Sequence, residues 1–174
     1  WFLSFAAGER QGGCRMKRAI CPGSFDPVTL GHVDIFRRAA RIFDELYIGV
    51  FNNIRKAPLL QTEERMELLR SAVADIPNVK VVAFDGLLAE YMIANDIQVI
   101  VKGLRSVTEY EYEQGQAQII KTMHPERDTM FLLGKPEYNS YSSSVVREII
   151  RFKGDYSRLV PHEVVEYLKG KNSV

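Results

Sequence analysis

The sequence predicts an α/β fold, a Rossmann-like, doubly wound, five-stranded parallel sheet with helices on both faces. Three observations favour this fold. Short apolar runs alternate with amphipathic stretches along the chain of 174 residues, as in successive βαβ units. The run Leu46–Phe51 is almost unbroken, as expected for a strand that is buried on both faces. Polar clusters follow the strand ends, which is where ligands of such sheets bind.

The expected strands and helices alternate in chain order. The expected strands are Ala19–Cys21, Leu46–Phe51, Val79–Phe84, Val99–Val101 and Met130–Leu133. The expected helices are about Val33–Phe43, one that begins at Thr62-Glu63-Glu64-Arg65, Leu87–Ala94, about Glu109–Met123, one with Val145, Val146, Ile149 and Ile150 inward, and Pro161–Lys169. Parallel strands end at one edge of a sheet, so the polar clusters that follow them predict one shared site.

Composition narrows the class of protein and of partner. Lys and Arg total 23 against 22 Asp and Glu, a near balance that gives no reason to expect a nucleic-acid partner. No run approaches the roughly 18 apolar residues of a membrane span, so no membrane partner is expected. Cys14 and Cys21 resemble neither a disulfide framework nor a metal site, and we expect free thiols in a reducing, cytoplasmic compartment.

The expected domain begins after an N-terminal segment of different character. Residues 1–15 lack the basic start and long apolar core of a secretion signal, and Gln11-Gly12-Gly13 is typical of a linker. We expect residues 1–15 to be a vector-derived or upstream-translated extension. Residues 16–174 are then expected to form a single domain, which agrees with the usual size of one.

The stretch Pro22–His32 is the most informative part of the chain. It joins the first strand to the first helix and contains Gly23, Ser24, Gly31 and a single histidine, His32. Such a turn at a helix start presents backbone N–H groups to a phosphate. The helix dipole there disfavours a protonated imidazole in the empty site, and a bound polyphosphate reverses that preference. His32 can then stabilise the charge that develops on a reacting phosphate.

The sequence lacks the motifs of several other classes of enzyme. There is no P-loop Gly-x-x-x-x-Gly-Lys-Ser/Thr, no Gly-x-Gly-x-x-Gly and no Gly-x-Ser-x-Gly elbow. The three histidines have no metal-ligand spacing with one another or with a cysteine, so no protein-held metal is expected. What remains is phosphate chemistry carried out by positioning and electrostatics.

Two motifs resemble the nucleotidylyltransferase superfamily. Thr29-x-Gly31-His32 is similar to its (His/Thr)-x-Gly-His signature, and Ser142-Ser143-Ser144-Val145-Val146-Arg147 is similar to its Ser-Ser-Thr/Ser-x-x-Arg signature. Within the superfamily, the chain resembles the bacterial phosphopantetheine adenylyltransferases. The further motifs that carry this resemblance are Pro22–Pro27, Thr62–Arg65, Gly103-Leu104-Arg105 and Glu109–Glu113.

The resemblance implies a reaction and a set of site residues. The phosphate of 4′-phosphopantetheine attacks the α-phosphorus of ATP, with Mg²⁺ assisting, and dephospho-CoA and pyrophosphate form. His32 is then the transition-state stabiliser, and Lys56 reaches the reacting phosphate. The implied ATP-binding residues are Ser24, Phe25, His32, Gly103, Leu104, Arg105, Glu113, Tyr138, Asn139, Ser140, Tyr141, Ser142, Ser143 and Ser144; the implied substrate-binding residues are Ser24, Lys56, Leu88 and Lys102. A homohexamer and feedback binding of CoA are also implied.

The sequence departs from this family at two places. Lys102 stands where the family usually has Arg, and a lysine offers a point charge instead of a bidentate fork. Tyr138-Asn139-Ser140-Tyr141 replaces the family's aromatic–Ser–aromatic–apolar order. Two alternative functions stay open at this point. One is a related adenylyl- or cytidylyltransferase that acts on another small phosphate, and the other is a non-catalytic sensor of CoA or nucleotide.

Overall fold

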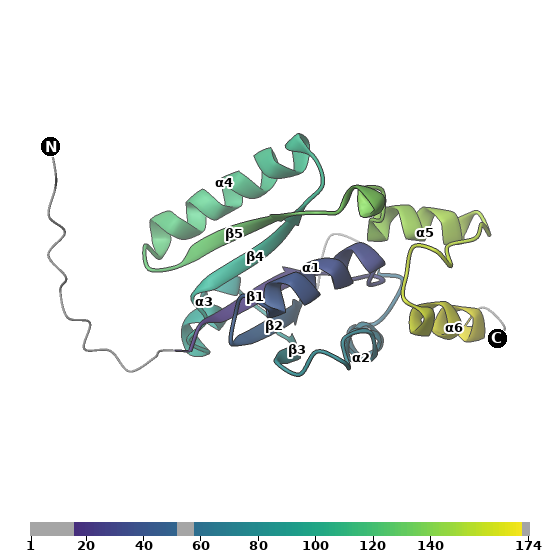
Figure 1. Cartoon of the computed structure of the whole chain (residues 1–174), viewed down its shortest axis with the longest axis horizontal. Helices are drawn as coiled ribbons and strands as arrows, with labels where there is room; N and C mark the ends of the chain where they lie inside the picture. The colour runs from purple at the N-terminus through teal and green to yellow at the C-terminus, as the bar shows by residue number, and fades with distance from the viewer. Residues whose placement is uncertain (1–15, 52–57, 172–174) are drawn as a thin grey trace, which may run out of the picture.

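The computed structural model describes residues 16–51 and 58–171. Strands and helices alternate almost throughout this part of the chain (Figure 1). The strands are β1 Arg18–Gly23, β2 Glu45–Val50, β3 Val79–Ala83, β4 Val99–Leu104 and β5 Asp128–Leu133. The helices are α1 Leu30–Ala40, α2 Thr62–Ala72, α3 Leu88–Ala94, α4 Val107–Met123, the 3₁₀ turn η1 Pro136–Tyr138, α5 Ser143–Arg151 and α6 His162–Lys171. Residues 1–15, which were expected to be an extension, lie outside the described part of the chain.

The strands form one five-stranded parallel sheet in the order β3-β2-β1-β4-β5. The chain winds outward from β1 to β3 and then crosses back to β4, on the other side of β1. This doubly wound order confirms the predicted fold class. The reversal lies between β1 and β4, and in such sheets ligands bind in the crevice beyond that point.

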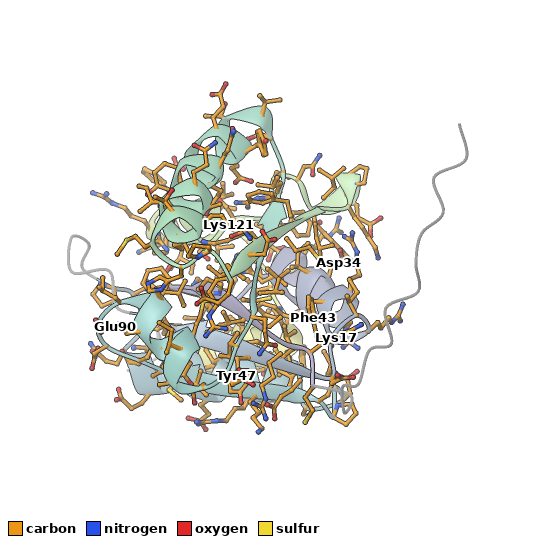
Figure 2. The ribbon with its side chains drawn as sticks, turned by 90° about the vertical axis from the view of Figure 1, so that its left-hand side faces the viewer. Lys17, Asp34, Phe43, Tyr47, Glu90 and Lys121 are labelled. Atoms are coloured by element: carbon orange, nitrogen blue, oxygen red, sulfur yellow. The ribbon has the colours of Figure 1, made fainter. Side chains whose placement is uncertain are left out.

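Helices cover both faces of the sheet because alternate strand residues point to opposite sides. Ala19, Cys21 and Leu46 belong to a core shared with α1, α2, α5 and α6. Ile20 and Tyr47, their immediate neighbours in sequence, belong to a second core with α3. Figure 2 agrees, since Asp34 on α1 and Glu90 on α3 lie on opposite sides of the molecule.

Most element boundaries differ from the sequence prediction by one to three residues, and two of these differences have an identifiable cause. The first helix begins at Leu30, three residues earlier than expected, because Thr29 caps it. The fourth strand continues to Leu104 because it pairs with β5 along its whole length, as far as Leu104 with Leu133. The prediction that Val145 points inward was wrong: its exposed fraction is 36%, and only Val146 on that helix is fully buried.

The remaining helices lie beyond the carboxyl end of the sheet. β5 runs into η1 and α5, and α6 follows beside α5 and α2 (Figure 1). This arrangement brings the chain from residue 134 onward back toward the end of β1. Over residues 16–51 and 58–171, no helix combines the length and the apolar character that a membrane crossing demands.

Candidate active site

The turn between β1 and α1 is held in place by hydrogen bonds to three other parts of the chain. Both carboxylate oxygens of Asp26 accept backbone N–H groups, from Leu59 and Leu60, at 2.9 Å each. Arg65 donates to the carbonyl of Ser24 at 2.9 Å, and Arg147 donates to the carbonyl of Asp26 at 2.6 Å. Because each bond is made to the buried or half-buried turn, its backbone has little freedom to collapse.

Phe25 shapes the floor of this turn. Its backbone has a φ of +46°, an unusual value for a residue with a side chain. The ring turns back beneath Gly23, where a Cβ would lie 2.6 Å from it, so only glycine fits there without movement. The same ring meets His32 edge to face at 5.2 Å between centroids and Phe36 at 5.4 Å. Phe25 is therefore an apolar support for the imidazole.

The hydrogen bonds of His32 determine which ring nitrogen carries the proton. His32 is the third residue of α1 and forms a capping box with Thr29. Its Nδ1 lies 3.1 Å from the backbone N of Thr29, which donates to it. An Nδ1 that accepts is unprotonated, so the neutral ring carries its hydrogen on Nε2. His32 therefore offers one N–H donor, from Nε2.

Thr29 and His32 are tied to the chain segment that follows β5. The hydroxyl of Thr29 donates to the carbonyl of Tyr141 at 3.0 Å, across 112 positions of sequence. It also accepts the backbone N–H of His32 at 3.4 Å. One threonine thus joins the histidine's helix to the Tyr138–Ser144 segment.

The imidazole of His32 is neutral in this environment. Burial among aromatic rings, followed by the nearby positive charge of Arg105, lowers the pKa of His32 from 6.5 to about 4. The expected direction is therefore found, although the causes are desolvation and Arg105 and not the helix dipole. An anion bound between His32 and Arg105 would favour the protonated ring.

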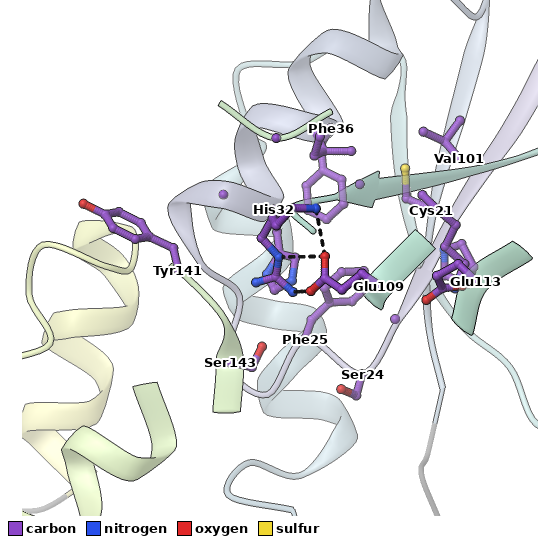
Figure 3. Close-up of a pocket in the computed structure, with 18 of the residues that line it drawn as sticks. Cys21, Ser24, Phe25, His32, Phe36, Val101, Glu109, Glu113, Tyr141 and Ser143 are labelled. Carbon is purple, nitrogen blue, oxygen red and sulfur yellow. Dashed lines mark hydrogen bonds and ion pairs between the residues drawn. The ribbon is translucent and has the colours of Figure 1, made fainter. Parts of the chain in front are cut away.

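A cavity of about 630 Å³ opens at the reversal between β1 and β4 (Figure 3). Its walls come from the carboxyl ends of both strands, from α1, from α4 and from the segment after β5. Ten of the predicted site residues line it, namely Ser24, Phe25, His32, Lys102, Gly103, Arg105, Glu113, Tyr138, Tyr141 and Ser143. Residues far apart in sequence thus meet in one site, as the strand-end clusters predict.

Two cations at the end of β4 are paired with two carboxylates of α4. Lys102 Nζ lies 3.0 Å from Glu113 Oε2. Arg105 bonds to Glu109 through its guanidinium, and its backbone N–H also donates to Glu109 Oε2 at 2.8 Å. The dashed lines in Figure 3 converge on Glu109 and mark its bonds with Arg105. Both cations face the cavity, where an anionic ligand can compete for them.

The serine run is arranged differently from what its motif suggests. Ser142 caps α5 by accepting the N–H of Val145 at 3.1 Å. Ser143 donates to the carbonyl of Pro27 at 2.8 Å, and the Ser144 hydroxyl lies 3.1 Å from Arg147 Nη2, which donates to it. The three hydroxyls therefore already serve to start the helix and to join it to the turn. The first-turn N–H groups of α5, which have no intrahelical acceptor, are the natural donors to a phosphate.

Several predicted site residues are not among those that line the cavity. Leu88 packs against the second core, and Leu104 is buried, so only its backbone can meet a ligand. Asn139 and Ser140 are exposed, and Ser142 and Ser144 stand at the rim through the bonds described above. Lys56, predicted to reach the reacting phosphate, lies outside the described residues.

Sequence reasoning missed Glu109 and two arginines, of which Arg65 is buried and Arg147 half-buried. The signal for Glu109 was available, because Glu109 and Glu113 are four residues apart on the expected helix and so share one of its faces. Arg65 and Arg147 were visible only as parts of motifs. Arg65 is 2% exposed although charged, and its partners lie as far as 41 positions away. No local sequence pattern predicts such long-range hydrogen bonds.

Neither a metal cluster nor a reactive thiol is present in the part of the chain that is described. Among these residues, no group of three or more His, Cys, Asp or Glu side chains is arranged to hold a metal ion. Cys21 lines the cavity, but burial raises its pKa to about 12, with Lys102 opposing the shift. The thiol is therefore neutral, and Cys21 serves as an apolar part of the wall.

Comparisons with known proteins place this site in a family. A cytidylyltransferase-like family model matches residues 20–149. The phosphopantetheine adenylyltransferase of Lachnoclostridium phytofermentans is 48% identical over 156 residues, covering 90% of this chain and 96% of that protein. Its counterpart from Dictyoglomus turgidum is 47% identical over 159 residues, covering 91% and 99%.

A solved structure shows the same fold at lower sequence identity. It belongs to a protein of Vibrio parahaemolyticus described as a nicotinate-nucleotide adenylyltransferase. The two align with a TM-score of 0.68 and 18% identity, over 89% of this chain and 93% of that one. Together with near-half identity to curated relatives over almost their whole length, the shared fold and the histidine site lead to one conclusion: the chain belongs to the phosphopantetheine adenylyltransferase family.

Proposed function

We propose that this protein transfers the adenylyl group of ATP to 4′-phosphopantetheine, in the penultimate step of coenzyme A synthesis. A phosphate oxygen of 4′-phosphopantetheine forms a bond to the α-phosphorus of ATP, and the bond from that phosphorus to the bridging oxygen breaks. The products are dephospho-CoA and pyrophosphate. The observation that carries the proposal is the Nε2–H donor of His32, which is fixed by Thr29 beside a cavity with two cations.

His32 and the two cations stabilise different negative charges in the site. The imidazole donor stabilises negative charge that develops on the α-phosphate, while Arg105 and Lys102 offset the charge of the two anionic substrates. Both cations are held by carboxylates before ligands arrive. A phosphate that binds therefore replaces Glu109 or Glu113 as the partner of a cation that is already paired. No covalent intermediate on the protein is required.

The two substrates are assigned to different parts of the site. We assign ATP to the turn and the segments after β4 and β5, which supply Ser24, Phe25, His32, Gly103, Leu104, Arg105, Glu113 and 138–144. We assign 4′-phosphopantetheine to Ser24, Lys56, Leu88 and Lys102. The side chain of Leu104 is buried, so its part is played by the backbone. Lys102 gives one point charge to a phosphate, and Glu113 sets its position.

Mg²⁺ enters this scheme as part of the nucleotide substrate. The described residues offer no cluster of ligands for a resident ion. Mg²⁺ usually keeps several water ligands and binds through substrate phosphates, which suits delivery as the ATP complex. We further propose that CoA binds the same site as a feedback ligand, that the protein acts in the cytoplasm, and that it assembles as a homohexamer.

Formation of dephospho-CoA tests the proposal directly. Purified protein with Mg²⁺, ATP and 4′-phosphopantetheine should release pyrophosphate and dephospho-CoA in equal amounts, and neither product should form when one substrate is omitted. The same assay with CTP or with nicotinate mononucleotide tests the related transferase activities. Tight CoA binding with no turnover of any pair would instead identify a sensor and contradict the proposal.

A further inference from the structure

Asp34 is a buried carboxylate on α1, two residues after His32, and the proposed mechanism does not use it. It is 8% exposed. Its Oδ2 lies 3.2 Å from Arg38 Nη1, and its Oδ1 lies 3.1 Å from Lys135 Nζ. Arg38 also donates to the carbonyl of Leu133, at 2.6 Å. We call Asp34, Arg38 and Lys135 the Asp34 cluster.

The Asp34 cluster joins α1 to the start of the segment 134–142. Other contacts attach the same segment to the start of α1. Tyr141 accepts the Thr29 hydroxyl near its far end. In its middle, Tyr138 lies so close to Gly31 that a Cβ there would be 3.4 Å from the Tyr138 Cβ. The helix that carries His32 is therefore also the support of this segment.

Because Asp34 is buried, its ion pairs can fix the position of the segments that they join. A buried carboxylate needs its partners, because removing them leaves a charge without compensation, whereas an exposed pair contributes little. The same helix offers the contrast. Arg37 pairs with Asp75, but their side chains are 47% and 59% exposed. Asp34 is 8% exposed and has partners both on its own helix and in the segment 134–142.

We propose that Asp34 is a positioning residue that, through Arg38 and Lys135, holds the segment 134–142 in the arrangement that binds ATP. Lys135 also lies 5.7 Å from the centre of the Tyr138 ring, so the cluster reaches a side chain of the cavity wall. Asp34 itself is not among the residues that line the cavity. It therefore acts on nucleotide affinity and leaves the chemical step to His32. This inference rests on the proposed function.

The variant Asp34→Asn tests the inference, because Asn keeps the shape and removes the charge. The dissociation constant of the ATP–Mg²⁺ complex, measured by calorimetry, and the KM for ATP should both rise about fivefold or more. The KM for 4′-phosphopantetheine and kcat should stay within about twofold. Lys135→Met should have the same effect, and the double variant should add little to either single one.

Asp75→Asn is the matched control, because it removes the other carboxylate that pairs with an arginine of α1. It should leave both substrate constants unchanged. The inference is overturned if Asp34→Asn binds ATP as tightly as the wild type, or if all constants worsen together with the melting temperature. Lys135 is half-exposed, so its variant decides the question should Asp34→Asn not fold. A wild-type protein that binds ATP but makes no dephospho-CoA contradicts the proposed function, while the calorimetry still tests the cluster.

Discussion

At the scale of single residues, the proposed chemistry depends on one imidazole and on what surrounds it. Thr29 donates its backbone N–H to Nδ1 of His32, and this leaves Nε2 as the only donor of the neutral ring. Phe25 and Phe36 lie against the ring and reduce its contact with water. Thr29 thus has two roles in the pattern Thr-x-Gly-His: its backbone N–H fixes the tautomer of the histidine, and its hydroxyl bonds to the segment that follows β5.

Replacing His32 by Ala should lower kcat by about 100- to 1,000-fold, as expected for loss of one transition-state donor. The KM values should change much less, because the donor acts on charge that develops during the reaction. Steady-state pyrophosphate release measures both constants. The control is His162→Ala, which removes an exposed histidine of α6 and should leave turnover unchanged. A loss of less than about tenfold would show that His32 is not the stabiliser.

The imidazole of His32 should titrate with a pKa of about 4 in the free protein, against an ordinary value of 6.5. Proton uptake by the unfolded chain then lowers stability as the pH falls from about 6.5 toward 4. Bound ATP should raise the pKa of His32, because phosphate charge favours the imidazolium. NMR titration of the ring signals can follow this, since the chain has 3 histidines. A free-protein midpoint near 6.5 would contradict the buried, neutral ring.

At the scale of elements, the turn after β1 is held by residues from several other elements. α2 supplies Arg65, the segment before α2 supplies the two N–H groups that Asp26 caps, and α5 supplies Arg147. The serine run belongs to the same arrangement, because Ser143 bonds to Pro27. Two motifs from opposite ends of the chain therefore form one unit, in which α5 supports the turn to which we assign the nucleotide.

The last helix is fixed to α2 by a carboxylate. Glu64 Oε1 accepts the Tyr167 hydroxyl at 2.5 Å and lies 2.6 Å from Lys171 Nζ. The hydrogen bond from Lys171, followed by that from Tyr167, lowers the pKa of Glu64 from 4.5 to about 2. Its contribution to stability is therefore complete above about pH 4.5 and is lost as the pH falls toward 2.

Glu64→Gln should make the protein less sensitive to acid than the wild type. Between about pH 5 and pH 3, the urea midpoint of the wild type should fall more than that of the variant, because only the wild type must protonate Glu64. Denaturation followed by circular dichroism gives both midpoints. Glu163→Gln, at an exposed site on α6, serves as the control and should follow the wild type. Parallel curves for all three proteins would contradict a strongly depressed pKa.

At the scale of the whole molecule, α4 has an exposed surface that packing within a single chain does not explain. None of its 17 residues is buried. Val107, Ile119 and Met123 are 74%, 62% and 62% exposed. An exposed apolar surface of this kind is typical of a contact between protein chains. It is the feature of the fold that best agrees with the proposed homohexamer.

The wild-type protein should have a mass about six times the 19.9 kDa of one chain when measured by light scattering after gel filtration. Ile119→Glu should shift it to smaller species, because a charge in an apolar contact is costly. The control is Ile93→Glu on α3, a helix that already packs against the sheet through Met92. A wild-type mass of one chain would contradict the proposed assembly.

Most of the fold could be predicted because its signals are local. Apolar periodicity located each strand and helix, and Thr29 and Ser142 stand directly before the helices they cap. Boundaries shifted by up to three residues, in one case through a local cap, Thr29, and in another through a partner strand, where β4 continues beside β5. The inward orientation of Val145 failed because helical spacing alone does not say which edge of an apolar stripe meets the core.

The sequence by itself determined the parallel sheet, the edge at which the site lies and the histidine at its centre, because strand periodicity and turn chemistry act between neighbours in the chain. Only the tertiary structure decided the tautomer of His32, the pairing of Lys102 and Arg105 with α4, and the support that Asp34 gives to the segment after β5. Each depends on interatomic distances that only the folded backbone sets, some between near neighbours, as in Thr29 and His32, and some between distant positions, as Arg147 and Asp26 show across 121 residues.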